Sequence, residues 1–263
     1  MIADFKFGAL VVFSLGLLLL IASLSAGEVL EDVVERRFPL DPSGTFSLRA
    51  IDGTVEIYGS DSREVKIVAT KRAFSLARLN AIVIRVDARP DAVSIETTPP
   101  PAPRHHFSDR SGTVEYTINV PQTARITRVE LPNGELVIDG MRGASIAACL
   151  GRGQLAIHNC FCDQTIHVNQ GGLNVFFDWV EERPITIEAE MDDGNVLARL
   201  PTEATFQLHA VTKQGHVSSD FSSMEARKRG DVSEINEEIG DAPATKLKLR
   251  ATDGNIHISE VVW

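Results

Sequence analysis

The sequence predicts an all-β fold, a stacked β-solenoid or flattened β-roll, preceded by one N-terminal transmembrane helix. The first observation is a glycine-centred pattern that recurs roughly every twenty residues, as in repeat proteins whose units bury their apolar faces by stacking. Each copy has two apolar residues spaced by two, a polar residue and glycine, and two more apolar residues spaced by two. The second observation is a stretch without charge, residues 7–27. The repeats centre on Gly53, Gly134, Gly153, Gly171, Gly194, Gly215 and Gly254.

The uncharged N-terminal stretch is long enough to cross a bilayer as a helix, which takes about 20 apolar residues. A secretory signal peptide has a shorter apolar stretch and small residues before its cleavage site. Here Leu24 would occupy the third position before a cut after Ala26, which is a poor site. We therefore expect residues 1–27 to be an uncleaved anchor, with a cleaved signal peptide as the alternative.

The charges beside this stretch predict its orientation. Lys6 precedes it, and Glu28, Glu31 and Asp32 follow it. Because cationic flanks stay in the cytoplasm, we expect a single pass through a bacterial inner membrane, with the C-terminal domain in the periplasm. Small residues spaced by four let another helix approach closely. The anchor residues expected to contact a neighbouring helix are Phe7, Phe13, Ala22 and Ala26.

Residues 28–45 are predicted to be a juxtamembrane helix and a linker. Val29, Leu30, Val33 and Val34 have helical spacing. Pro39 would end the helix.

A β-solenoid domain is expected over residues 46–263. Alternating apolar residues predict strands, and residues 72–79 read as a short helix or loop. The proline-rich segment 98–110 is predicted to be an exposed loop, because proline withholds a donor from a sheet. The strands expected before the main repeats are 46–51, 55–58, 64–70, 81–87, 93–97 and 112–120.

From residue 127 to 221 the repeat is nearly continuous. Period-two alternation places the apolar residues on one face of each strand, and glycine supplies the positive φ that a tight turn requires. Residues 222–245 are rich in charge and are predicted to be an exposed insertion. Residues 247–258 would form the final rung. The expected inward residues are Val129, Leu131, Leu136, Ile138, Ala148, Leu150, Leu155, Ile157, Ile166, Val168, Leu173, Val175, Ala189, Met191, Val196 and Ala198.

With its apolar N-terminus, the start FSLRAIDGTVEIYGSDSREVKIVATKRA and the end LKLRATDGNIHIS, the chain resembles the bacterial putative adhesin family of envelope domains. The resemblance covers nearly everything after residue 37. It implies a stacked all-β solenoid or flattened β-roll. It carries over no functional residues, because the family has no established active site.

His158, Cys160, Cys162 and His167 are weak candidates for a metal site, since zinc and copper favour these ligand types. The Cys-x-Cys spacing is atypical for zinc, and both histidines fall on outward positions. A disulfide between Cys149 and one of the other two cysteines is a second interpretation, and free buried thiols are the third. No cofactor is predicted.

The polar residues that precede four glycines allow two interpretations. Asp52, Asn133, Asp193 and Asp253 could form a calcium ladder, or they could serve turn chemistry. The turn interpretation is favoured because the calcium pattern GGxGxD is absent. The tripeptide Arg229–Asp231 (RGD) lies in the charged insertion and is a weak indication of adhesion.

Net charge and the absence of catalytic motifs limit the classes of function that the sequence predicts. The net charge of −10 argues against nucleic-acid binding, which favours a basic face. The sequence contains no G-x-S-x-G, HExxH, P-loop or G-x-G-x-x-G motif, so no enzymatic activity is predicted. We expect a non-catalytic, membrane-anchored subunit that docks on other membrane or envelope proteins, such as a respiratory or photosynthetic complex. The alternatives are an adhesin-like ligand-binding module at the cell surface and, remotely, a polysaccharide-acting enzyme.

Overall fold

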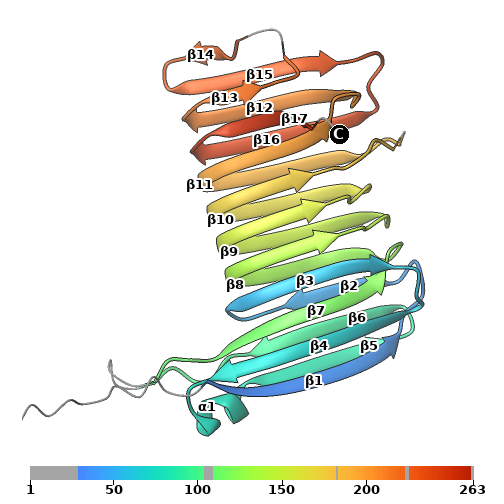
Figure 1. Cartoon of the computed structure of the whole chain (residues 1–263), viewed down its shortest axis with the longest axis vertical. Helices are drawn as coiled ribbons and strands as arrows, with labels where there is room; N and C mark the ends of the chain where they lie inside the picture. Colours follow the sequence, from blue (N-terminus) through green and yellow to red (C-terminus); the bar gives the residue numbers. More distant parts are fainter. Residues whose placement is uncertain (1–28, 104–108, 182, 223–224, 262–263) are drawn as a thin grey trace, which may run out of the picture.

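A computed structural model describes residues 29–103, 109–181, 183–222 and 225–261, and this part consists of strands with one short helix, α1 (Leu76–Ala81) (Figure 1). The all-β prediction is confirmed. The strands are β1 (Leu30–Pro39), β2 (Thr45–Arg49), β3 (Gly53–Ser60), β4 (Glu64–Ala73), β5 (Val83–Arg89), β6 (Ala92–Thr98), β7 (Thr113–Pro121), β8 (Arg125–Asp139), β9 (Ser145–His158), β10 (Asp163–Phe176), β11 (Thr186–Pro201), β12 (Phe206–Gln214), β13 (Val217–Ser219), β14 (Arg227–Arg229), β15 (Val232–Ile239), β16 (Thr245–Asp253) and β17 (Ile256–Val261).

The strands form two facing layers, because each long strand bends at its glycine and contributes one half to each layer. Layer A runs β5-β6-β2-β8-β9-β10-β11-β16-β12-β15-β14. Layer B runs β1-β4-β7-β3-β8-β9-β10-β11-β17-β13. Figure 1 shows the resulting elongated stack. Neighbouring rungs pair in parallel from β2–β3 to β12–β13.

The bending glycines lie in a column along one edge of the stack, which we call the glycine edge. All seven have φ between +132° and +148°, so the predicted positive φ is confirmed. Close approach is a second reason for glycine. A Cβ on Gly134 would lie 1.7 Å from the carbonyl oxygen of Gly53, and a Cβ on Gly153 would lie 1.8 Å from that of Gly134. A side chain would therefore force neighbouring rungs apart.

The order of rungs in the stack differs from their order in the chain. The β2–β3 rung pairs directly with β8, although β4 to β7 lie between them in sequence. The last rung, β16–β17, lies between β11 and the β12–β13 rung. The last rung in sequence therefore lies within the stack and not at its end, which the similarity of the repeats allows.

The core fills the space between the two layers. The predicted inward residues from Val129 to Ala198 are all buried, and none of them is more than 5% exposed. Side chains alternate along a strand, so each rung supplies apolar side chains from both of its halves. The inward assignment of the repeat is confirmed.

The juxtamembrane helix that was predicted to end at Pro39, within residues 28–45, is wrong. Residues 30–39 form β1, which pairs antiparallel with β4 from Leu30 opposite Ala73 to Pro39 opposite Glu64. Leu30, Val34 and Phe38 share the inner face and are four residues apart. This spacing is compatible with both a helix and a strand. Pairing with β4 decides the outcome.

Within the charged insertion 222–245, the structure has a hairpin that the sequence did not predict. Residues 227–239 form the hairpin β14–β15, and β15 extends layer A by pairing antiparallel with β12. Ser233 and Ile235 point inward and are buried, a short alternation that the surrounding charges obscure. Within 98–110, Thr98 ends β6 and the described residues that follow are irregular.

The predicted membrane anchor, with Phe7, Phe13, Ala22 and Ala26, lies outside the described residues. In the part of the chain that is described, no helix has the length and apolar character to cross a bilayer. The anchor stays a prediction.

Candidate functional site

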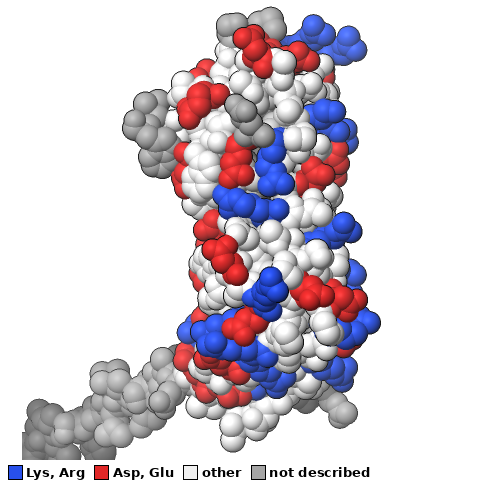
Figure 2. All heavy atoms as spheres, turned by 90° about the vertical axis from the view of Figure 1, so that its right-hand side faces the viewer, with Lys and Arg blue, Asp and Glu red and all other residues white. Residues whose placement is uncertain are grey.

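The edge opposite the glycines carries the loops that join successive rungs, and we call it the loop edge. These loops comprise residues 140–144, 159–162, 177–185 and 202–205, and in Figure 1 they project on the right-hand side. The loop from 177 to 185 is the longest of the four. Viewed from that side, acidic and basic side chains are interspersed, without a large area of one sign (Figure 2). Any selective binding there would depend on shape and apolar contact more than on net charge.

Asn159 anchors the long loop to the rung below it. Asn159 is buried, and its φ of +49° turns the chain at the end of β9. Its Nδ2 donates to Asp178 Oδ2 at 2.7 Å, and its Oδ1 accepts from the backbone nitrogen of Asp178 at 2.8 Å. His158 Nε2 lies 2.9 Å from the same carboxylate oxygen, and its ring stacks on Phe176. This network fixes the start of the loop.

An aromatic cluster is formed by residues that are close in sequence to Asn159 and Asp178. Phe161 and Phe177 are buried, with their ring centroids 5.1 Å apart. The Trp179 ring lies 5.5 Å from Phe161, yet Trp179 is 43% exposed and its neighbour Val180 is 38% exposed. The cluster thus presents a large apolar side chain to solvent on a buried aromatic base.

Arg142 and Glu181 fix the orientation of the tryptophan. The Arg142 guanidinium lies over the rings of Phe161 and Trp179, at 5.3 and 5.9 Å from their centroids, a cation–π arrangement. Arg142 Nη2 donates to Glu181 Oε1 at 2.6 Å, and Trp179 Nε1 donates to the same oxygen at 3.3 Å. We call these six residues the aromatic patch: Arg142, Phe161, Phe177, Trp179, Val180 and Glu181.

A shallow apolar hollow of about 40 Å³ adjoins the aromatic patch. Ile185, just before β11, and Leu200, near its end, line the hollow together with Ala204 and Phe206, at the start of β12. This surface combines an exposed tryptophan, an arginine and an apolar floor. Such residues often contribute most of the binding free energy at protein interfaces. No pattern in the sequence predicted this surface. Its one signal in the sequence is that Phe161, Phe177 and Trp179 fall outside the period-two pattern.

The four weak metal candidates do not converge. His158 is directed toward Asp139 and Asp178, whereas Cys160 and Cys162 are buried in the core. His167 lies beside Glu190 and Asp192 of the next rung. Within the described residues, no group of three His, Cys, Asp or Glu side chains has the geometry to hold a metal ion.

All three cysteines are free thiols, so the disulfide interpretation is wrong. Burial raises the pKa of the Cys162 thiol to about 12 and also raises the pKa of Cys160. The Sγ of Cys160 lies 3.3 Å from the carbonyl oxygen of His158. Since thiolates, not thiols, bind metals and attack electrophiles, these two side chains act as core residues. Cys149 is only half-buried.

The polar residues before the glycines form side-chain ladders on the glycine edge. Asn133 Nδ2 donates to Asp52 Oδ1 at 2.8 Å, and Gln170 Nε2 donates to Asp193 Oδ2 at 3.0 Å. Asp253 lies opposite Asp193 in the register. The two hydrogen bonds are exposed and link neighbouring rungs, whereas Asp253 and Asp193 share only the backbone register.

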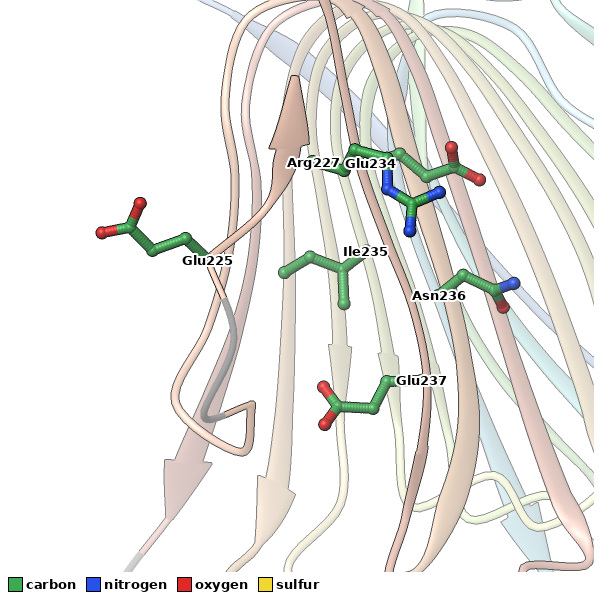
Figure 3. A pocket seen from close by; sticks show the side chains of 6 residues that line it. All are labelled: Glu225, Arg227, Glu234, Ile235, Asn236 and Glu237. Carbon is green, nitrogen blue, oxygen red and sulfur yellow. The ribbon is translucent and has the colours of Figure 1, made fainter. Parts of the chain in front are cut away.

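The C-terminal end of the stack has a second hollow, of about 300 Å³, beside the β14–β15 hairpin. Figure 3 shows its carboxylates, Glu225, Glu234 and Glu237, pointing in different directions, with Arg227 beside Glu234. They therefore form no common cation site. The RGD tripeptide, Arg229–Asp231, occupies the exposed tip of this hairpin, where Gly230 has φ of +62°.

The family profile of the domain described as Toastrack DUF4097 matches residues 42–259. The chain belongs to this Toastrack family. The expected likeness to the putative adhesin family is confirmed. No curated protein matches the Toastrack chain.

One solved structure has the same fold. A "putative cell adhesion protein" from Clostridium sporogenes is 14% identical, with a TM-score of 0.52, over 88% of this chain and 100% of the other. A "putative adhesin" from Bacteroides fragilis is 8% identical, with a TM-score of 0.32, over 87% and 97% of the two chains. The likeness to the Clostridium protein concerns the fold alone.

Proposed function

We propose that this Toastrack chain is a non-catalytic, adhesin-like binding module, and that the aromatic patch contacts its protein partner. The observation that carries the proposal is the exposed, oriented Trp179 beside an apolar hollow. A tryptophan that is fixed before binding loses little conformational entropy on association. The name of the Clostridium relative agrees with an adhesion role, but the argument rests on the patch.

A protein partner fits this surface better than a glycan. Glycan sites combine aromatic platforms with several polar side chains, whereas the hollow beside Trp179 is lined mainly by aliphatic and aromatic residues. An apolar side chain of a partner would fill the hollow, with Arg142 and Glu181 at its rim. Their salt bridge is exposed enough to exchange partners on binding, with side chains 30% and 27% accessible.

The location of the domain is part of the proposal. An anchor at residues 7–27 would hold the stack at the periplasmic face of an inner membrane and leave the loop edge free. A role as an accessory subunit of a membrane complex would then be one form of the same binding function. Membrane fractionation with a carbonate wash tests the anchor. Intact mass measurement shows whether the first 27 residues are retained.

Parallel affinity capture from native membranes tests the patch. The wild-type chain, Trp179→Ala and the control Leu76→Ala serve as baits, since Leu76 is 62% exposed on α1 and lies outside the patch. We expect at least one stoichiometric protein to be lost with Trp179→Ala and kept with Leu76→Ala. Retention of every partner by Trp179→Ala would contradict the proposal. Hits on a glycan array that disappear with Trp179→Ala would favour a glycan partner instead.

A further inference from the structure

Strand β1 ends layer B, and the short helix α1 lies next to it (Figure 1). Among the described residues β1 pairs with β4 alone, and its ten residues make it the longest of the terminal strands. The other terminal strands, β5, β13 and β14, have seven, three and three residues. A long open edge presents unpaired backbone donors and acceptors to another chain.

The residues of β1 are complementary to themselves in one antiparallel register. When Val34 lies opposite Val34 of a second copy, Asp32 lies opposite Arg36 on the core-facing side. Leu30 then lies opposite Phe38 on the same side. On the outer side, Glu31 lies opposite Arg37. Opposite charges and apolar pairs directly across an antiparallel ladder are stabilising.

Neighbouring registers lack this property. Only shifts by two residues keep both cores on the same side, because side chains alternate between faces. A shift in one direction places Glu35 opposite Glu35, and a shift in the other places Glu31 opposite Glu35. Like charges directly opposed are destabilising. Among these three registers, the Val34 register alone combines opposite charges with apolar pairs.

Arg36 gives the second copy a specific role. Arg36 is exposed and has no ion pair within the described residues, whereas Asp32 pairs with Lys71. The Asp32 side chain is still 48% accessible. In the Val34 register, each Arg36 would pair with Asp32 of the second copy. By symmetry, the dimer would contain two such pairs.

We propose that β1 is a self-association edge, through which two copies pair antiparallel about Val34 and extend layer B across the dimer. The two stacks would then run in opposite directions from the joint, and the two C-terminal hairpins would lie at the far ends. A symmetric dimer uses the same patch on both subunits. This surface is separate from the aromatic patch and stands independently of it.

Disulfide crosslinking of the full chain in mild detergent tests the register. Val34→Cys in a Cys149→Ser background should form a crosslinked dimer under mild oxidation, because directly opposed residues lie within disulfide reach. Glu31→Cys in the same background is the control. Its two copies would be separated by six residues along the ladder, roughly 20 Å. Equal crosslinking of both variants, or none with Val34→Cys, would overturn the proposal.

Sedimentation equilibrium measures the contribution of charge. Arg36→Glu should raise the dimer dissociation constant about tenfold or more, because it opposes two carboxylates at each of two equivalent sites. Arg229→Glu, an equal charge change at the opposite end of the stack, should leave it unchanged. A wild-type chain that stays monomeric at high micromolar concentration would exclude the dimer. A dimer that is insensitive to Arg36→Glu would exclude this interface.

Discussion

The middle and the ends of the stack are built by different rules. Rungs β8 to β11 are nearly identical, with parallel pairing on both sides and a glycine at every bend. The N-terminal end uses the antiparallel strands β1, β4 and β5, and the C-terminal end uses the β14–β15 hairpin. A parallel solenoid leaves open edges at both ends, and antiparallel strands cover them. The regular parallel rungs stabilise the middle of the stack, and the antiparallel strands form the surfaces at its two ends.

The largest effect should come from a charge in the middle of the core. Leu136→Asp should lower the free energy of unfolding by several kcal/mol, a large part of a typical total of about 5–15 kcal/mol. Leu136 is fully buried, so its carboxylate would have no water. Urea denaturation measures the change. Glu135→Gln, on the exposed neighbour, should cost little, and equal losses would contradict the inward assignment.

Substitution of two glycines with positive φ separates the cost of close packing from the cost of backbone strain. Gly153→Ala should cost about 2–5 kcal/mol, because it adds overpacking against Gly134 to the strain. Gly230→Ala at the hairpin tip should cost only about 1–2 kcal/mol, since nothing lies within 4 Å of its Cβ position. Thermal or urea unfolding measures both. Similar costs would show that stacking of the glycine edge adds nothing.

Hydrogen exchange should map the same contrast without mutation. Amides in the paired halves of β9 and β10 should exchange only through global unfolding, because both neighbours protect them. Amides on the outer edge of β14 should exchange much faster by local opening, because β14 pairs only with β15. Mass-detected exchange at several times resolves the two classes. Equal protection of β9, β10 and β14 would require a partner on the β14 edge.

The smallest effect concerns thiol reactivity. Burial raises the thiol pKa of Cys162 to about 12 and also raises that of Cys160, so near pH 7.5 both stay protonated and unreactive. Iodoacetamide should therefore modify neither in the folded chain. Cys149 should react slowly, because partial burial raises its pKa too. Peptide mapping should find all three modified in urea, and native labelling of Cys160 would contradict its burial.

Local patterns predicted the repeats well because period-two alternation and glycine chemistry act over a few residues. The sixteen inward positions and the seven glycines needed no tertiary information. In residues 30–38 the apolar spacing fits both a helix and a strand, and pairing with β4 decides between them. Ser233 and Ile235 show the same limit, because two inward residues are too few to identify β15 among charged neighbours.

The candidate site was harder to predict than the fold. The aromatic patch joins three loops from successive rungs, and only the stacking brings Arg142, Phe161 and Trp179 together. Its residues carry no motif, and each is an ordinary loop residue in the sequence. Conversely, the His158–Cys162 segment has a motif-like composition. The fold directs its histidine outward and its cysteines inward.

The position of the β16–β17 rung has a consequence for biosynthesis. A ribosome releases β12 and β13 before β16 and β17 exist, so a nascent chain ending near residue 244 has no strands to join β11 to β12. Both of those strands then expose apolar surface and unpaired backbone groups toward the gap. A premature stop codon just before residue 245 should therefore remove far more structure than the two strands themselves. Residues 245–261, which form β16 and β17, would decide whether the newly made chain closes or is degraded.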